Sequence, residues 1–525
     1  MAKNMFYFIS TCLLLTFGWM IYTQYHPLWV IVPGLTYLAI GTYDLLSKHN
    51  ILRLYPVIGH LRFIFEFIRP EIQQYFVATN LSGKPFNREQ RSLVYQRSKN
   101  VEDSHPFGTE HEISSAGYIL AQHSLNPKKV PISETRIMVG NHLCKKPYYA
   151  SRINISAMSY GALGKNAILA LNRGAKLGGF AHNTGEGGLT HYHTKEGGDI
   201  ILQIGTGYFG MRDSHGRFCR ETFKKTIETH ANIKMIEIKL SQGAKPSHGG
   251  LLPKEKITAE IAKFRMIDRD KDCLSPAKHS EFSNPLELMH FIHELRELSG
   301  GLPIGFKLCI GIKKEFMSLC KAMMKTEIYP DFITVDGAEG GTGAAPVEFS
   351  NRLGTPINHG LSFVHNVLTG CAIRKHVKII ASGKIITSFD VALKLALGAD
   401  LCNMARPMMF ALGCIQSLHC NTNACPTGIA TTDEKRNSAI DIDDKSKRVK
   451  NFHKNTMHNL LEVVGAMGIA RLDDLKPHHF FQRDVHGHPT HLGKQFQFIE
   501  ENHFYSGQIG QPYQTDWENA SESYF

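Results

Sequence analysis

The chain has 525 residues, of which 42% are hydrophobic and 20% charged, and this composition excludes a disordered or collagen-like protein. Its net charge of +12 suits an anionic partner, but no Lys/Arg-rich block with interleaved aromatic residues occurs, so an anionic membrane face and anionic small molecules are favoured over nucleic acid. Eleven cysteines, mostly scattered, favour a reducing compartment over a disulfide framework.

Residues 1–48 are predicted to form a transmembrane hairpin. Met5–Tyr22 is uncharged, largely apolar and long enough to span a bilayer as a helix, and Leu28–Tyr43 is a second, shorter run interrupted by Pro33-Gly34. Lysines and arginines flank the two runs but not the turn between them, which places both ends, and the residues that follow, on the cytoplasmic side of the cytoplasmic membrane. A cleaved signal peptide is the alternative, although no small-x-small site follows the first run.

Residues 49–150 are predicted to be an extension and cap. Between Ile51 and Phe76, apolar residues alternate with basic ones, which is typical of an amphipathic helix. Such a helix would lie either on the bilayer surface or against the main domain. Residues 78–150 are polar and rich in turn formers, so we expect an irregular segment with a few strands.

Between residues 151 and 432, short β-branched runs alternate with helix-like segments such as Lys165–Leu177, Pro285–Leu298 and Phe389–Leu397. Eight such units predict an α/β fold, a (β/α)8 TIM barrel, with a doubly wound sheet as the alternative. The expected strands are Ile153–Met158, Gly178–His182, Ile200–Ile204, Met235–Leu240, Ile304–Ile310, Phe332–Val335, Val377–Ala381 and Leu401–Met404.

One glycine motif in this region, Gly205–Gly210, matches GxGxxG after an apolar strand. It is followed by Gly216 and other turn formers in place of a helix, and no acidic residue ends a second strand about twenty residues later, as a dinucleotide-binding unit requires. We therefore interpret the motif as a tight loop, with a nicotinamide site as the weaker hypothesis.

Glycine and polar residues gather after several predicted strands, where barrel active sites are built. Glycines let backbone N–H groups approach an anionic oxygen, so these loops predict a phosphate-bearing cofactor, with simple chain reversal as the alternative. If that cofactor is a flavin, Lys307, on the fifth predicted strand, would stabilise the anion of its reduced form. The alternative is a lysine in the barrel interior that is paired with a carboxylate.

Three cysteines lie within twelve residues, at Cys414, Cys420 and Cys425. Three thiolates with no fourth partner suit an iron–sulfur cluster lacking one corner iron, whereas a zinc site would need a fourth ligand and CxxC-type spacing. Three unrelated buried thiols are the alternative. A cluster beside a phosphate site implies a redox cofactor between them, and FMN fits a barrel of this size.

Several motifs, which occur in the same order as in the family, resemble the FMN domain of glutamate synthase over about residues 140–435. The hairpin and Tyr55–Arg97 resemble the shorter, stand-alone FMN-binding glutamate synthase family. The motifs that carry the resemblance are Met158-Ser-Tyr-Gly-Ala-Leu163, Asn183-Thr-Gly-Glu-Gly-Gly188, Gln242-Gly-Ala-Lys-Pro246, Gly340-Gly-Thr-Gly-Ala-Ala-Pro346, and the stretch from Ala411-Leu-Gly-Cys through Cys425-Pro-Thr-Gly-Ile-Ala430.

The resemblance implies a barrel that binds FMN and a [3Fe-4S] cluster held by the three cysteines. 2-Oxoglutarate and ammonia would condense to 2-iminoglutarate, and hydride from reduced flavin would give L-glutamate. It further implies catalytic roles for Lys245, Glu186 and Gln242, which would bind the dicarboxylate together with Arg265. The cofactor-binding residues would be Ser156, Ala157, Met158, Ser159, Asn183, Lys307, Gly340, Gly341, Thr342, Ser382 and Gly383.

The chain differs from the large, multidomain glutamate synthase in ways that bear on its partners. Residue 2 is Ala where that enzyme begins with a cysteine nucleophile, and no glutaminase domain fits, so ammonia would be free or come from another subunit. No NADPH domain fits either, so electrons would come from ferredoxin, a reductase subunit or a membrane carrier. Two alternatives stay open: an FMN oxidoreductase linking another 2-oxo or 2-amino acid to quinone, and a non-catalytic electron-transfer subunit.

Residues 433–525 are predicted to be a C-terminal extension. The charged stretch Asp433–Lys450 predicts a loop, Phe452–Met467 a helix, and Leu472–His479 resembles a short C-terminal element of the family. The last forty or so residues predict a polar tail. The many histidines show no HExxH-type spacing and are interpreted as surface or packing residues.

Overall fold

The computed structural model describes residues 2–25, 27–101, 104–505 and 509–525, and it divides into two units, Met1–Arg88 and Glu89–Phe525. Each unit is described by itself below. The first carries two long apolar helices, and the second carries the barrel.

The first unit begins with helices α1 (Ala2–Thr23) and α2 (Leu28–Leu46), each long and apolar enough to cross a membrane by length and composition. The expected interruption at Pro33 is wrong, because α2 runs through it, as helices of this kind tolerate proline. The helices pack through small residues: a side chain at Gly34 would meet Phe17, and one at Gly41 would meet Phe6.

The predicted amphipathic helix is split into α3 (Asn50–Leu54), α4 (Gly59–Ile72) and a π-helical turn, Gln73–Val77. Asp44, buried near the end of α2, holds the break between α3 and α4. Its carboxylate accepts a 2.8 Å hydrogen bond from the Val57 N–H and lies 2.8 Å from Nε2 of His60. The helical character is therefore confirmed, and its continuity is not.

The second unit is built on a closed barrel of eight parallel strands, in which the last strand pairs with the first. Each of the eight predicted runs contains or overlaps one of them, so the predicted (β/α)8 TIM barrel is confirmed. The strands are β4 (Ile153–Ile155), β5 (His182–Asn183), β6 (Ile200–Ile204), β7 (Ile233–Lys239), β10 (Ile304–Leu308), β11 (Phe332–Asp336), β12 (Lys378–Ser382) and β13 (Leu401–Met404).

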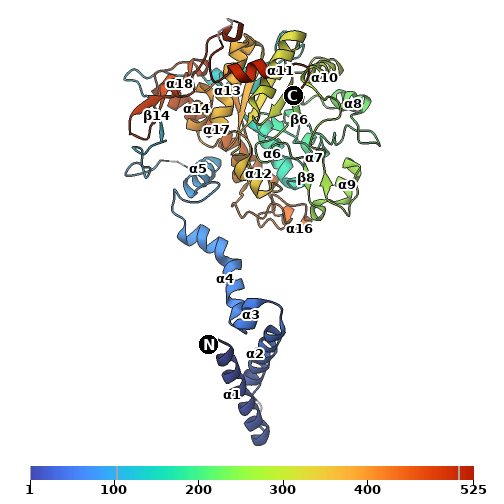
Figure 1. The fold of residues 1–525 in the computed structure, drawn as a ribbon, viewed down its shortest axis with the longest axis vertical. Helices are drawn as coiled ribbons and strands as arrows, with labels where there is room; N and C mark the ends of the chain where they lie inside the picture. The colour runs from blue at the N-terminus through green and yellow to red at the C-terminus, as the bar shows by residue number, and fades with distance from the viewer. Residues whose placement is uncertain (1, 26, 102–103, 506–508) are drawn as a thin grey trace. The chain divides into compact units, whose positions relative to one another are not determined.

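A helix follows each strand, and the longer helices lie around the strands in Figure 1. Local capping explains where two of them begin: Asn284 accepts the N–H of Glu287, and Thr387 forms a capping box with Asp390. The helices are α6 (Lys165–Gly178), α7 (His191–Thr194), α8 (Arg220–Thr229), α10 (Pro285–Leu298), α11 (Lys313–Thr326), α13 (Ile357–Gly370), α14 (Ser388–Ala396) and α15 (Arg406–Leu412).

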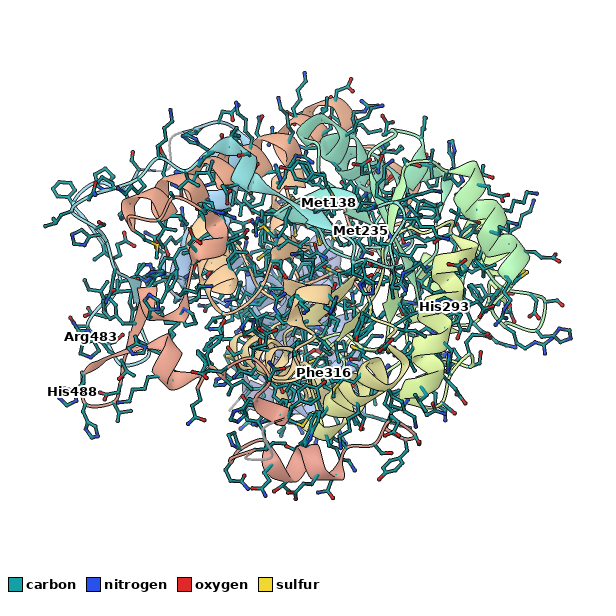
Figure 2. All side chains as sticks on the ribbon, turned by 90° about the horizontal axis from the view of Figure 1, so that it is seen from above. Met138, Met235, His293, Phe316, Arg483 and His488 are labelled. Carbon is teal, nitrogen blue, oxygen red and sulfur yellow. The ribbon has the colours of Figure 1, made fainter. Side chains whose placement is uncertain are left out.

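The barrel interior changes from apolar to charged along its axis, as strand β7 illustrates. Alternate residues of a strand face the same side, so Met235, Glu237 and Lys239 succeed one another inside the barrel. Met235 lies in the hydrophobic core, and it is seen in the interior in Figure 2, where His488 projects from the periphery. The polar and charged positions therefore lie toward the carboxyl ends of the strands.

An antiparallel hairpin, β2 (Arg136–Val139) and β3 (Tyr148–Ser151), closes the other end of the barrel. Val139, Tyr148 and Ala150 of the hairpin share one hydrophobic cluster with residues from five barrel strands and from the loop before β5. These residues are Ala181, Ile201, Met235, Phe332, Ile380 and Leu401. Because this end is sealed by apolar packing, chemistry is confined to the opposite end.

Two segments expected to be irregular are helical. Helix α5 (Arg88–Ser98) lies within the predicted cap, and α17 (Ile442–Ala466) begins inside the predicted loop Asp433–Lys450, packing along α6. The charged residues that favoured a loop lie on the outer face of α17, while its inner face recurs every three or four residues. That buried face comprises Ser446, Val449, Phe452, His453, Thr456, Met457, Leu460, Val464 and Gly465.

The C-terminal segment, expected to be a polar tail, folds onto the barrel unit in the residues that the structure describes. Strands β1 (Ile119–Ala121), β14 (Phe480–Arg483) and β15 (Pro489–His491) form a small sheet, and α19 (Gln514–Asn519) packs on α11. The remaining short elements are β8 (Leu251–Leu252), β9 (Cys273–Leu274), α9 (Ala259–Arg265), α12 (Val347–Arg352), α16 (Glu434–Asn437) and α18 (Leu492–Gln495).

Candidate active site at the open end of the barrel

A carboxylate surrounded by lysines lies at the carboxyl ends of the strands. Glu186, in the loop after β5, forms a 2.8 Å ion pair with Nζ of Lys239 at the end of β7. Burial alone would raise the pKa of Glu186, but Lys239, Lys245 and Lys307 together hold that pKa below its usual value. The Glu186 carboxylate is therefore ionised, and three cations share its surroundings.

Lys245 belongs to the loop that follows β7 and is almost completely buried. Its ammonium group donates a 2.8 Å hydrogen bond to the carbonyl of Gly249. Burial lowers its pKa to about 8, although Glu186 acts in the opposite direction. Burial likewise lowers the pKa of Lys239. These are cations kept in a poorly hydrated place, where their attraction for an anion is strong.

Arg265, at the end of α9, brings a fourth cation to the same face. Its guanidinium is buried, donates a 2.9 Å hydrogen bond to the carbonyl of Tyr160 and lies 4.9 Å from the ring centroid of Phe209. The Tyr160 hydroxyl in turn donates to Glu260 of α9 at 2.8 Å. Helix α9 is thus fastened to the loop after β4, and Arg265 is held on the barrel.

A cleft beside this cluster collects residues from the ends of six strands. Of the predicted cofactor residues it is lined by Ser156, Ala157, Lys307, Gly340, Gly341, Ser382 and Gly383, and it is also lined by Gln242. The other predicted residues lie elsewhere: Met158 and Ser159 follow in the loop after β4, Asn183 points into the barrel, and Thr342 is exposed.

The residues of the cleft fit a phosphate-bearing flavin. Gly383 has a φ of +136°, which favours glycine, and a side chain at Gly340 would stand 2.9 Å from the Ala244 amide nitrogen, so neither position readily accepts a larger residue. Oδ1 of Asn403 is buried without a hydrogen-bond partner among the described residues. Within the same described ranges, no ion pair or hydrogen bond joins the buried Lys307 ammonium to a carboxylate, although its charge acts on Glu186, so the alternative of a lysine paired with a carboxylate is not observed.

Three residues of the site were missed by the sequence reasoning. Lys239 was predicted only as the end of a strand that precedes the glycine-containing loop. It lies two residues after Glu237 on β7 and therefore also faces the barrel interior. Asn403 and Arg406 follow the last strand and line the cleft. Burial lowers the pKa of Arg406 to about 10, and the side chain donates to the carbonyl of Glu339.

The cysteine loop follows α15. The thiols of Cys414, Cys420 and Cys425 lie near enough to influence one another electrostatically, and burial raises the pKa of Cys414 to about 12. Hydrogen bonds from Thr427, Ala430 and Ile429 lower the pKa of Cys425 against the effect of burial. In the described part of the chain, no group of three or more His, Cys, Asp or Glu forms a ready-made metal site.

The loop is anchored from several sides. The hydroxyl of Tyr95 donates to the Cys414 carbonyl at 2.5 Å, and the Asn423 side chain donates to the Glu255 carbonyl at 2.8 Å. Oδ1 of Asn423 also accepts from the Thr432 N–H. A loop this firmly held, with N–H groups directed at sulfur, has the donor set that iron–sulfur clusters use.

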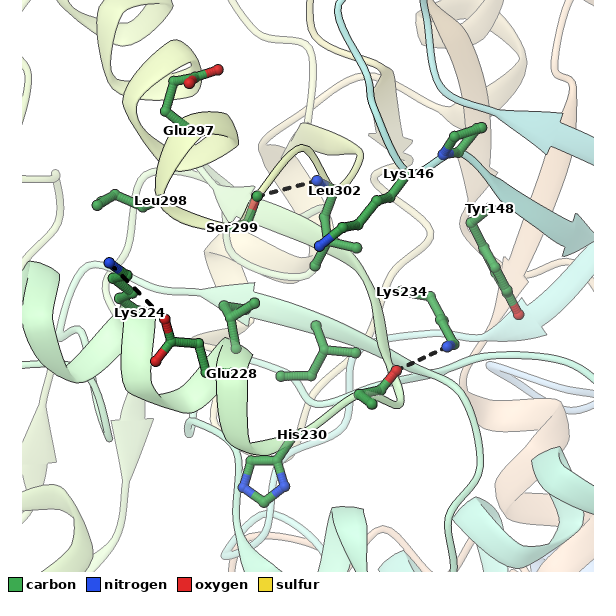
Figure 3. Close-up of a pocket in the computed structure, with 15 residues that line it drawn as sticks. Lys146, Tyr148, Lys224, Glu228, His230, Lys234, Glu297, Leu298, Ser299 and Leu302 are labelled. Atoms are coloured by element: carbon green, nitrogen blue, oxygen red, sulfur yellow. Dashed lines mark hydrogen bonds and ion pairs between the residues drawn. The ribbon is translucent and has the colours of Figure 1, made fainter.

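A larger cavity, of about 580 Å³, lies at the opposite end of the barrel (Figure 3). Two of its lysines are engaged in local contacts: Lys224 lies 4.0 Å from Glu228, and Nζ of Lys234 donates to the carbonyl of Ala231. It opens where strands β7 and β10 begin, the face of a barrel that serves stability. We therefore do not assign the active site there.

A family model, described as the conserved region in glutamate synthase, matches residues 97–470 of the chain. The chain belongs to the glutamate synthase family. The predicted family is thus confirmed, and with it the prediction that the chain is an oxidoreductase enzyme.

Individual relatives differ in how much of their length the chain spans. The glutamate synthase large subunit-like protein YerD of Bacillus subtilis is 39% identical over 480 residues, which is 84% of this chain and 90% of YerD. The archaeal glutamate synthase [NADPH] of Methanocaldococcus jannaschii is 35% identical, and the match covers 62% of this chain and 60% of the length of that relative. The ferredoxin-dependent glutamate synthase 2 of Synechocystis is 30% identical over 62% of this chain, and the match covers 21% of the length of that relative.

Among solved structures, a mandelate oxidase variant with 2-hydroxy-phenylacetamide matches at 14% identity and a TM-score of 0.41, covering 79% of this chain and 95% of that one. A flavocytochrome b2 variant with pyruvate bound matches at 13% identity and a TM-score of 0.41, covering 90% of this chain and 97% of that one.

Proposed function

We propose that this chain is a glutamate synthase-type oxidoreductase that reduces 2-iminoglutarate, formed from 2-oxoglutarate and ammonia, to L-glutamate. The observation that supports this most strongly is the ionised Glu186 among Lys239, Lys245 and Lys307, beside a glycine-lined cleft at the same strand ends. So many cations around one carboxylate leave positive charge for an incoming dicarboxylate.

Different residues suit the two carboxylates of the substrate. Arg265 suits one carboxylate, because a guanidinium forms two parallel hydrogen bonds with it. Lys239 and Lys245 suit the other carboxylate and the adjacent oxygen or nitrogen. Gln242 lines the cleft and would orient the imine toward the cofactor. Their burial excludes water, which strengthens each of these attractions.

The reduction adds a hydride to the imine carbon and a proton to its nitrogen, after condensation has released water. FMN, when bound in the cleft, supplies the hydride. The proton is assigned to Lys245, whose pKa of about 8 lets it give and regain a proton near neutral pH. Glu186 holds the lysines in place and balances their charge before substrate binds.

The flavin would be held by groups at the ends of five strands. Gly341, Gly383 and Arg406 line the cleft, and the backbone N–H groups of the two glycines and the guanidinium of Arg406 suit a phosphate. Gly340 also lines the cleft, but its N–H donates to the Gly337 carbonyl at 2.9 Å. Lys307 would stabilise the negative charge of a reduced ring, and the amide of Asn403 offers it a hydrogen bond. Ser156, Ala157 and Ser382 complete the lining.

Cys414, Cys420 and Cys425 are proposed to ligate a [3Fe-4S] cluster that passes electrons to the flavin. Their shared loop, their electrostatic coupling and the N–H groups directed at Cys425 support this assignment. Iron and sulfide analysis of anaerobically purified protein tests it. Cys425→Ser should lose the iron, whereas Cys144→Ser, which changes a thiol far from the loop in sequence, should keep it.

The activity is tested by steady-state turnover with dithionite as the electron source. We expect glutamate from 2-oxoglutarate and ammonium, and a parallel reaction with glutamine in place of ammonium identifies the nitrogen donor. Electrons in the cell would come from ferredoxin or a reductase subunit. FMN-loaded protein that forms no glutamate with ammonium contradicts the proposal.

Helices α1 and α2 favour one alternative, an FMN oxidoreductase that exchanges electrons between another 2-oxo or 2-amino acid and a membrane quinone. The two functions are separated by mixing reduced protein with either a soluble quinone or 2-oxoglutarate plus ammonium. Faster reoxidation by quinone favours the alternative.

We further propose that α1 and α2 tether the protein to the cytoplasmic membrane, with the barrel in the cytoplasm. Full-length protein should stay in the membrane pellet after an alkaline carbonate wash, and mass spectrometry should find its N-terminus intact. Release by carbonate, or a mature chain shortened after the first helix, contradicts the tether.

A further inference from the structure

Lys256 is a buried lysine beside the cysteine loop. It ends a short 3-10 turn, Lys254–Lys256, between β8 and α9, and its side chain is about as buried as the barrel core. Among the described residues it has no ion pair with a carboxylate. The acidic groups that act on its ammonium are the thiols of Cys420 and Cys425.

The ammonium group of Lys256 has three acceptors. Its Nζ lies 2.7 Å from the carbonyl oxygen of Ala162, 3.2 Å from that of Cys420 and 3.1 Å from that of Ala430. Donating to three carbonyls takes three N–H bonds, which a lysine has only in its charged form. The geometry therefore places a full positive charge here.

The three carbonyls belong to separate parts of the site. Ala162 lies in the loop after β4, which lines the cleft at Ser156 and Ala157, whereas Cys420 is the middle cysteine of the cysteine loop and Ala430 follows its last cysteine. One side chain thus ties the cleft loop to the middle and to the end of the cysteine loop. A shift of the ammonium would move all three segments.

A buried cation without a nearby carboxylate is costly, since carbonyl dipoles replace only part of its hydration. A thiolate-bound iron centre carries net negative charge and would offset that cost. We propose that Lys256 is the counter-ion of the metal centre on the cysteine loop, and that its charge raises the centre's reduction potential. This inference rests on the proposed function, because it requires the cluster.

The physical reason is electrostatic. Reduction adds one negative charge to the centre, and a fixed positive charge in a place of low dielectric favours the reduced form. Lys256 acts on the metal through its thiolate ligands and their backbone, so it is a positioning residue and not a ligand. A purely structural clamp would hold the loop equally well without changing the potential.

The test is a redox titration of the full-length protein followed by electron paramagnetic resonance, with iron content measured on each sample. Lys256→Gln keeps an N–H donor but removes the charge. We expect it to keep its iron and to favour the oxidised centre about tenfold more than wild type, a fall of about 59 mV for one electron. Lys256→Arg keeps the charge and should stay near the wild-type potential. Lys254→Gln removes an exposed charge from the same turn and should change nothing.

Each other outcome decides the matter. Loss of iron from Lys256→Gln but not from Lys256→Arg supports the counter-ion, because only the charged side chain retains the centre. An unchanged potential in iron-loaded Lys256→Gln, or loss of iron from both variants, overturns it and leaves a structural clamp. Wild-type protein without iron overturns the proposed cluster as well, which distinguishes the two failures.

Discussion

Nζ of Lys239 lies 2.8 Å from Oε1 of Glu186, an ion pair between the end of β7 and the loop after β5. The Lys239 side chain is only 8% exposed, so the pair is poorly screened by water. Because Lys245 and Lys307 also act on Glu186, the carboxylate is the negative centre of a cationic cluster. A dicarboxylate that entered this cluster would compete with Glu186 for the lysines.

Removing Lys239 should therefore weaken substrate binding. Lys239→Met is expected to raise the KM for 2-oxoglutarate at least about tenfold, about 1.4 kcal/mol. Lys234→Met alters a lysine at the opposite end of the same strand and is the matched control. Steady-state kinetics with ammonium in excess measures both. A KM for Lys239→Met equal to that of the control would remove Lys239 from the substrate site.

The pH dependence should report Lys245. Burial lowers its pKa to about 8, so the side chain is a cation below that pH and loses its charge as the pH rises through it. The kcat/KM for 2-oxoglutarate reflects the free enzyme and should be level below about pH 8 and fall above it. Lys245→Arg stays charged, so its residual activity should not fall in that range. The same decline in Lys245→Arg would assign the titration to another group.

The flavin cleft depends on glycine at residue 340. A side chain there would stand 2.9 Å from the amide nitrogen of Ala244, so Gly340→Ala must push the loop after β11 away from the loop after β7. We expect FMN affinity to fall about tenfold or more. Gly311→Ala, at the end of β10 with no neighbour within 4 Å, is the control. Flavin titration of the deflavinated proteins measures the effect, and equal affinities would place the flavin elsewhere.

The polar layer beneath the site should matter for stability. Glu237 accepts hydrogen bonds inside the barrel from Asn183 at 2.8 Å, Gln203 at 2.6 Å and Thr334 at 2.6 Å. Glu237→Ala leaves three buried donors without their acceptor and should lower the free energy of unfolding by at least about 3 kcal/mol.

Glu228→Ala removes an exposed glutamate from α8 and should change that free energy by no more than about 0.5 kcal/mol. Chemical denaturation followed by circular dichroism compares the two variants. Equal midpoints and slopes would mean that water enters the barrel and satisfies the three donors of the Glu237 variant.

The barrel was predictable from sequence because its strands are short apolar runs separated by amphipathic helices. The helix over Phe452–Met467 was also predicted, but the start of α17 was not, because the charges there hide a buried face that includes Val449. Of the site, glycine-rich loops were recognisable by composition. Asn403 and Arg406 were not, because they enter the cleft only when the last strand closes the barrel beside β12 and β4.

Asn183 illustrates the same limit. Its motif resembles a cofactor loop, yet the amide is directed at Glu237, a partner 54 residues later in the chain. Nothing local in the sequence distinguishes a side chain that faces the cofactor from one that faces the barrel interior. That distinction comes from the register of β5 against β6, and of β6 against β7.

A single-turnover experiment tests the central claim most directly. Protein with bound FMN is reduced without oxygen, mixed with 2-oxoglutarate and ammonium, and followed by flavin absorbance and glutamate analysis. The account predicts reoxidation of the flavin with one glutamate formed for each pair of electrons lost. A flavin that stays reduced in the presence of both substrates, yet is reoxidised by quinone, would contradict it.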